Sequence, residues 1–107
     1  MVEQRRSHRL RVAVPVRVKR KGADGEGAPG QARDMSIGGM YVETEAPLAF
    51  GAEAIVHLSL PGYKDDLVLP AVVRWTRQDG MGLQFGLLGA RETHAITELV
   101  RKGTDPK

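Results

Sequence analysis

Cysteine is absent from the 107 residues of the chain, and aromatic residues make up only 5% of them. A chain without cysteine forms no disulfide and offers no thiolate to a metal or a substrate, which fits a reducing compartment. No apolar run approaches the length of a membrane-spanning helix, and the basic N-terminal end lacks the apolar stretch of a signal peptide. We therefore expect a cytoplasmic protein with no membrane span and a core of Val, Leu, Ile and Ala.

Acidic residues are scarce in the first 21 residues. Eight of the 16 Lys and Arg residues lie there, and only Glu3 opposes them, although the formal net charge of the whole chain is just +3. A basic end on a nearly neutral body favours an anionic partner, such as a nucleotide, a nucleic acid or an acidic protein.

The patterns that indicate an enzyme or a metal site are also missing. The chain has no cluster of paired carboxylates and no recognisable nucleophile–base pair, and its histidines lack metal-ligand spacing. The glycine-rich stretch at 22–30 does not have the spacing of a phosphate-binding loop and does not open a helix. We predict no enzymatic activity, no metal and no cofactor.

Alternating apolar residues predict strands along most of the chain. From Leu10 to Lys19, Val alternates with mostly polar residues, as in a half-buried strand, and Pro15 within it predicts a sheet edge or a bulge. Residues 22–30 read as a mobile, exposed loop. Further strands are expected at 31–35, 40–44, 54–60, 67–76 with an interruption at Pro70, and 81–87 after a tight turn at 78–80.

The last part of the chain changes its period. Residues 90–102 contain no Gly or Pro, and Ile96, Leu99 and Val100 follow helical spacing, with Gly103 suited to the C-terminal cap. Several short strands followed by one helix predict a mainly β fold, either a small antiparallel barrel or a sandwich. We divide the chain into a flexible basic arm at 1–9, one domain at 10–103 and a frayed tail at 104–107.

The arm carries an R-x-x-x-R motif formed by Arg5 and Arg9, with Arg6 inside it. An arginine fork binds phosphate oxygens or the O6/N7 edge of guanine with two hydrogen bonds, and its flat face stacks on a base. The alternative interpretation is a solvated basic tail, because this spacing arises by chance in arginine-rich segments.

A D-x-S-x-x-G motif follows about 25 residues later, with Asp34, Ser36 and Gly39. The Asp carboxylate is suited to accept hydrogen bonds from the N1–H and N2–H₂ donors of guanine, and the Ser hydroxyl donates or accepts. Gly38 and Gly39 allow backbone to approach a ligand or to turn with positive φ. The alternative is a plain β-turn in which Asp and Ser bond to local backbone.

In this order, on a small β-rich chain, the two motifs resemble those of the PilZ domain, a bacterial receptor module for cyclic di-GMP. The resemblance covers roughly residues 4–102. It includes the apolar strand at 10–18, Val72-Val73-Arg74-Trp75 and Gly82-Leu83-Gln84-Phe85. It implies a six-stranded antiparallel β-barrel with a C-terminal α-helix.

The resemblance also implies a ligand site for cyclic di-GMP. Its expected members are Arg5, Arg6, Arg9, Asp34, Ser36, Gly38, Gly39 and Trp75. Trp75 either packs on a base of the ligand or belongs to the core. In this family the residue before the first motif influences whether one ligand molecule or a stacked pair binds, and Gln4 leaves the stoichiometry open.

The expected function is that of a receptor whose arm orders over cyclic di-GMP and offers a changed surface to an unidentified protein partner. The resemblance suggests motility, biofilm or adhesion machinery as the target, and a monomer or weak dimer. One alternative is a PilZ-type adaptor that works without nucleotide. Another is a nucleic-acid-binding barrel, against which the few aromatic residues and the acidic Asp34 argue.

Overall fold

The computed structural model describes residues 10–60 and 62–102, and within them the chain forms six strands and one helix. The basic arm at 1–9, the cap at Gly103 and the tail at 104–107 lie outside the described residues. The elements are β1 (Leu10–Arg20), β2 (Ala28–Ser36), β3 (Gly39–Glu43), β4 (Glu53–Leu58), β5 (Leu67–Arg77), β6 (Gly80–Phe85) and α1 (Ala90–Lys102).

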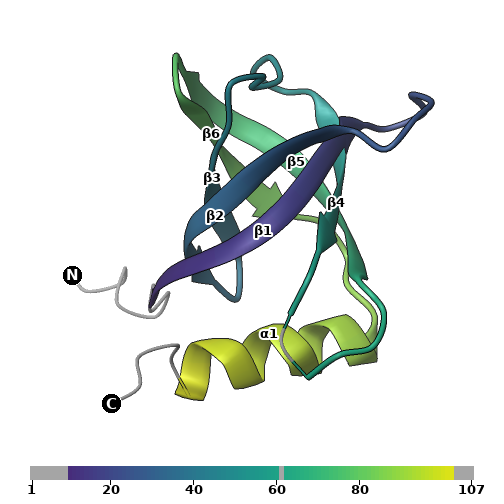
Figure 1. Ribbon diagram of the computed structural model, residues 1–107, viewed down its shortest axis with the longest axis vertical. Helices are drawn as coiled ribbons and strands as arrows, with labels where there is room; N and C mark the ends of the chain where they lie inside the picture. The colour runs from purple at the N-terminus through teal and green to yellow at the C-terminus, as the bar shows by residue number, and fades with distance from the viewer. Residues whose placement is uncertain (1–9, 61, 103–107) are drawn as a thin grey trace.

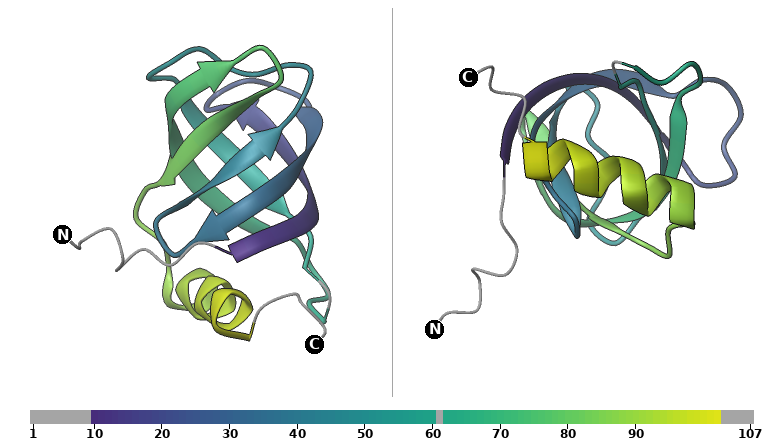
Figure 2. Two further views of the ribbon diagram at one scale, coloured as in Figure 1. Left: turned by 90° about the vertical axis from the view of Figure 1, so that its left-hand side faces the viewer. Right: turned by 90° about the horizontal axis from the view of Figure 1, so that it is seen from below.

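The strands form a closed antiparallel barrel in the order β1-β2-β3-β6-β5-β4 (Figure 1). The predicted mainly β fold, a six-stranded barrel with a C-terminal helix, is therefore confirmed. The helix α1 lies across one open end of the barrel, as the view from below in Figure 2 makes clear. Closure removes free sheet edges, so every strand has two neighbours.

The core lies inside the barrel and beneath the helix. The four valines at alternate positions of β1, residues 12, 14, 16 and 18, are all buried, as the period-two pattern predicts. From the helix, Ala95 and Ile96 are each only 1% exposed and seal the end of the barrel. Leu, Met, Ala and Val fill the rest, and no aromatic side chain is among the buried residues of the described part.

Of the two alternatives that Pro15 predicted, the sheet edge is wrong, since β1 pairs with both β2 and β4. The bulge is present, because the register of β1 against β2 shifts between Arg11 and Val14, just before Pro15. Pro15 is tolerated because the β1–β4 ladder begins only at Val16, and the Pro15 carbonyl accepts from the Ser59 amide at 3.4 Å beyond the end of β4. Pro70 does not interrupt β5 for the same reason. Its carbonyl accepts from Gly86 at 2.8 Å, just past the end of β6.

One strand is longer than predicted. Residues 28–30, expected in the loop, belong to β2, because Ala28 and Pro29 pair with the end of β1. The Arg17 guanidinium also donates to the Gly27 carbonyl at 3.0 Å and so fastens the end of the loop to β1. The other strand boundaries agree with the predicted ones within two residues, and the helix has the predicted bounds.

Candidate functional site

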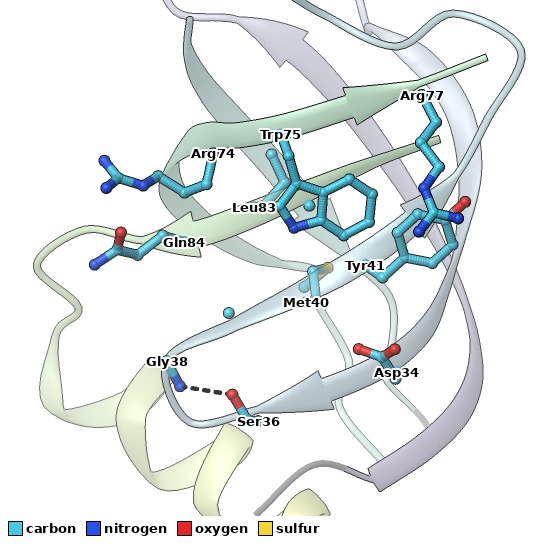
Figure 3. Close-up of a pocket in the computed structure, with 12 residues that line it drawn as sticks. Asp34, Ser36, Gly38, Met40, Tyr41, Arg74, Trp75, Arg77, Leu83 and Gln84 are labelled. Atoms are coloured by element: carbon cyan, nitrogen blue, oxygen red, sulfur yellow. Dashed lines mark hydrogen bonds between the residues drawn. The ribbon is translucent and has the colours of Figure 1, made fainter. Parts of the chain in front are cut away.

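A hollow of about 740 Å³ lies on the outer face of the barrel over β3, β6 and β5, next to the end of β2 (Figure 3). The structure brings five of the predicted site residues together there: Asp34, Ser36, Gly38, Gly39 and Trp75. The other three, Arg5, Arg6 and Arg9, lie outside the described residues. The remaining lining residues are Met40, Tyr41, Arg74, Arg77, Gly82, Leu83 and Gln84.

Two glycines of β6 make room for the aromatic rings of the hollow. A Cβ atom added at Gly82 would overlap the indole of Trp75, and one added at Gly80 would overlap the phenol ring of Tyr41. In the strand register, Gly82 lies opposite Tyr41 on β3 and opposite Trp75 on β5. The bare backbone of β6 therefore serves as a floor on which side chains from both neighbouring strands lie.

The two rings on this floor stack on each other. The ring centroids of Tyr41 and Trp75 are 5.3 Å apart, and the rings are inclined by only 13°. The guanidinium carbon of Arg77 lies 4.9 Å from the indole centroid, in cation–π contact. A flat apolar surface flanked by cationic groups is suited to a planar, anionic ligand.

The phenol of Tyr41 is held in place by a neighbouring turn. Its hydroxyl donates a hydrogen bond to the carboxylate of Asp79 at 3.3 Å. Partial burial and then the negative charge of Asp79 raise the pKa of Tyr41, while Arg77 opposes the shift. The hydroxyl therefore stays protonated at neutral pH and keeps its bond to Asp79.

Trp75 faces outward because β5 contains one extra residue. Up to Val73 the strand alternates regularly, with its odd-numbered residues buried, so Trp75 would be expected to point into the barrel. Val73 lies opposite Leu83, however, and Trp75 lies opposite the next residue of β6, Gly82, so Arg74 is the extra residue. This bulge reverses the alternation, and Trp75 is 41% exposed rather than part of the core.

A second register shift turns Asp34 outward in the same way. Ala32 is buried and lies opposite Val42, and Asp34 lies opposite Tyr41, so Arg33 is the extra residue of β2. A regular strand would direct Asp34, two residues after Ala32, into the core. The shift directs it into the hollow, and Arg33 lies outside the hollow, where it pairs with Glu43 at 3.6 Å.

The turn between β2 and β3 has the local hydrogen bond that the plain-turn interpretation predicts. The Ser36 hydroxyl, only 2% exposed, accepts from the Gly38 amide at 3.1 Å. Neither Gly38 nor Gly39 has positive φ, contrary to one of our expectations. Gly39 is instead needed for close strand packing, because a Cβ there would overlap the Leu83 carbonyl on β6.

Sequence reasoning missed four polar or aromatic residues of the hollow, namely Tyr41, Arg74, Arg77 and Gln84. Arg77 could have been found, since residues two apart on a strand share a face and it follows Trp75 by two. Tyr41 and Gln84 come from strands that meet β5 only in the folded barrel. Arg74 would be expected on the face opposite to Trp75, were it not for the bulge.

Charge in the hollow favours an anion. Its charged side chains in the described part of the chain are Arg74, Arg77 and Asp34, a net charge of +1 before any contribution from the basic arm.

Within residues 10–60 and 62–102, no group of three or more His, Asp or Glu side chains is placed to hold a metal ion. No helix in the same part of the chain is long and apolar enough to cross a membrane.

The closed barrel, the helix at its end and the polar, aromatic hollow on its outer face define a class of small β-barrel domain. The family model of the PilZ domain matches residues 3–102, and the chain belongs to this family. PilZ domains are cyclic di-GMP-binding and adaptor domains rather than enzymes, and cyclic di-GMP is a ligand of the family rather than a cofactor.

Solved structures of PilZ proteins share the fold. The inhibitor of motility MotI/DgrA of Bacillus subtilis has a TM-score of 0.73 and 19% identity over 94% of this chain and 51% of that one. The PilZ domain of CeSA from a cellulose-synthesizing bacterium has a TM-score of 0.72 and 22% identity over 90% of this chain and 97% of that one. The K. pneumonia MrkH–c-di-GMP complex has a TM-score of 0.69 and 19% identity over 95% of this chain and 52% of that one.

The chain thus spans about half the length of MotI/DgrA and of MrkH. No curated protein sequence matches it significantly.

Proposed function

We propose that the chain binds cyclic di-GMP in the hollow over β3, β6 and β5 and relays this event to a partner protein. One observation carries the proposal. Residues as far apart in sequence as Asp34 and Trp75 line a single hollow with a net positive charge and a stacked aromatic pair. The family to which the chain belongs includes cyclic di-GMP receptors, and the similar MrkH was solved as a complex with this nucleotide.

The chemistry of the hollow suits a guanine. The Asp34 carboxylate accepts hydrogen bonds from the N1–H and N2–H₂ donors of the base, and the indole of Trp75 offers a surface for stacking. The Ser36 hydroxyl already accepts from the Gly38 amide, so its own hydrogen is available to donate to an acceptor of the ligand. Backbone at Gly38 is exposed and unobstructed, which allows close approach of the ligand.

The basic arm would provide the remaining contacts through Arg5, Arg6 and Arg9. At the start of β1, Arg11 lies opposite Asp34 in the ladder with β2, so the chain enters the barrel beside the hollow. Each charge-assisted hydrogen bond from an arginine contributes about 1.5–3 kcal/mol. A few such bonds offset the cost of ordering the five residues from Arg5 to Arg9, about 1–2 kcal/mol per residue. Ordering of the arm then changes the surface that a partner protein meets.

Isothermal titration calorimetry with cyclic di-GMP tests the proposal. We expect saturable binding at micromolar or lower concentration, lost in Arg5→Ala and in Asp34→Ala but retained in Arg20→Ala, which removes an exposed arginine away from the hollow. The stoichiometry also answers the question that Gln4 leaves open. GTP serves as the control nucleotide. A flat titration of folded protein at millimolar nucleotide would overturn the receptor function and favour the adaptor, whose captured partners do not depend on nucleotide.

Ionic strength provides a second measurement. Two phosphates that meet several guanidinium groups interact less strongly when salt screens their charges. We therefore expect the affinity for cyclic di-GMP to fall between low and physiological ionic strength. An unchanged affinity would contradict a binding mode that depends on the arginines of the arm.

A further inference from the structure

Arg74 and Trp75 are consecutive residues of β5, yet both are exposed and both line the hollow. In a regular strand, neighbours point to opposite faces. The bulge at Arg74 cancels this alternation and places Arg74 on the outer face of the barrel together with Trp75. Bulges of this kind re-aim side chains, and this one adds to the hollow a cation that neither sequence motif contains.

The guanidinium of Arg74 is not engaged by the described part of the protein. Arg77 lies against the indole of Trp75, and Arg33 pairs with Glu43. Arg74 has neither an ion pair nor a hydrogen bond among residues 10–60 and 62–102. Its N–H donors are therefore available to a ligand in the hollow.

The position of Arg74 relative to the rings determines which part of a ligand it meets. In Figure 3, Arg74 lies beside Gln84 on one flank of Trp75, and Arg77 lies with Tyr41 on the other flank. A base that stacks on the indole lies nearly parallel to it. The edge of such a base, rather than its face, then points toward the side chains that flank the ring.

We propose that Arg74 binds the O6/N7 edge of a guanine stacked on Trp75, and that it is a specificity-determining residue of the site. This inference rests on the proposed function. Arginine donates two parallel hydrogen bonds to O6 and N7 of guanine. Adenine carries an amino group in place of O6. Because this amino group is itself a donor, it forms no hydrogen bond with the N–H groups of Arg74. The neighbouring Gln84 offers an amide to the same edge.

The test pairs a change in the protein with a change at one position of each guanine of the ligand. Cyclic di-GMP is compared with its 7-deazaguanine analogue, in which a C–H group replaces N7, and both are titrated into the wild-type protein and the Arg74→Ala and Arg20→Ala variants. The ratio of the two dissociation constants isolates the contact with N7 in each protein. Arg20 is an exposed arginine outside the hollow. Arg20→Ala therefore removes the same charge as Arg74→Ala without changing the hollow, and serves as its control.

We expect the wild type and Arg20→Ala to bind the 7-deaza analogue about tenfold more weakly than cyclic di-GMP, as loss of a charge-assisted hydrogen bond requires. In Arg74→Ala this ratio should fall several-fold, while cyclic di-GMP itself binds more weakly than to the wild type. Arg74→Lys keeps the charge and can still donate to N7, but it lacks the planar fork, so its ratio should lie between those of the wild type and Arg74→Ala.

Two results would overturn the inference. Affinity for cyclic di-GMP unchanged in Arg74→Ala would mean that Arg74 makes no contact, and an equal ratio in the wild type and Arg74→Ala would mean a contact with phosphate or a purely electrostatic effect. Failure of the wild type to bind cyclic di-GMP is a different outcome, because it overturns the proposed function itself. Circular dichroism and thermal unfolding verify that each variant is folded.

Discussion

Gly38 and Gly39 are neighbours in one motif, but their surroundings differ. Only the Ser36 hydroxyl oxygen, at 3.9 Å, would lie near a Cβ at Gly38, whereas a Cβ at Gly39 would overlap the backbone carbonyl of Leu83. Backbone inside a closed barrel yields little, since both neighbouring strands hold it. The second glycine therefore has a structural role whether or not a ligand binds, and the first is free to serve a ligand.

This difference predicts the stability of two alanine variants. We expect Gly39→Ala to lower the free energy of unfolding by about 1–3 kcal/mol, because the methyl group forces β3 and β6 apart. Gly38→Ala should change it by no more than about 0.5 kcal/mol. Urea unfolding of both variants measures the difference. Equal losses would contradict the assignment of Gly39 as the site of close strand packing.

The ionisation of Tyr41 is a second prediction at this scale. Burial and the charge of Asp79 raise its pKa. In Tyr63→Phe, where Tyr41 is the one tyrosine left, the absorbance of the phenolate should therefore rise with a pH midpoint above the ordinary tyrosine pKa of about 10. A raised pKa means that the folded state holds its proton more tightly than the unfolded state. This contribution to stability is complete below about pH 10 and is lost as the pH rises through the pKa of the folded protein.

Asp79→Asn provides the control for this titration. It removes the negative charge that disfavours the phenolate and should lower the pKa of Tyr41 toward its ordinary value, while the effect of burial persists. A phenol that titrates at the same pH in both proteins would show that Asp79 does not act on Tyr41 in solution.

At the scale of the element, β6 differs from the strands beside it. Its outward positions are Gly80, Gly82 and Gln84, so the ring-bearing side chains of β3 and β5 lie over a bare strand. Glycine in a strand interior usually weakens the strand, and it marks places where another group must approach closely. In this barrel the approaching groups are the rings of Tyr41 and Trp75.

Gly82→Ala should therefore displace the indole. The chain contains a single Trp, so its fluorescence reports this position alone. We expect the emission to shift to longer wavelength as Trp75 moves off β6 into solvent, and the affinity for cyclic di-GMP to fall. Gly86→Ala, where the nearest atom to a new Cβ is 3.5 Å away, should leave both unchanged. An unshifted emission in Gly82→Ala would mean that the indole of Trp75 does not lie against the backbone of β6 at Gly82.

At the scale of the whole molecule, the helix completes the core. Ile96 in α1 is 1% exposed at the end of the barrel, whereas Leu87, just before the helix, is 94% exposed. We expect Ile96→Ala to lower the free energy of unfolding by about 2–5 kcal/mol through lost burial and a new cavity. Leu87→Ala should cost no more than about 0.5 kcal/mol. Similar unfolding curves for the two variants would mean that the helix is not part of the cooperative unit.

Much of the architecture could be read from the sequence because it depends on local periodicity. The alternation in β1, the helical spacing of Ile96 and Leu99, and the turn at 78–79 each involve residues close together in the chain. The helix has its predicted bounds, and the predicted strands appear with small shifts. The two motifs led to the correct family, since each lies within a few residues.

The tertiary structure alone decided how Asp34 and Trp75 reach the hollow and which further side chains join them there. Regular alternation directs Asp34 and Trp75 into the core, and only the pairing of β2 with β3 and of β5 with β6 reveals the extra residues that turn them outward. Closure of the barrel likewise gave β1, which contains Pro15, a neighbouring strand on both sides. Strand order and register are set by contacts between distant residues, and a single shift of register exchanges the two faces of a strand.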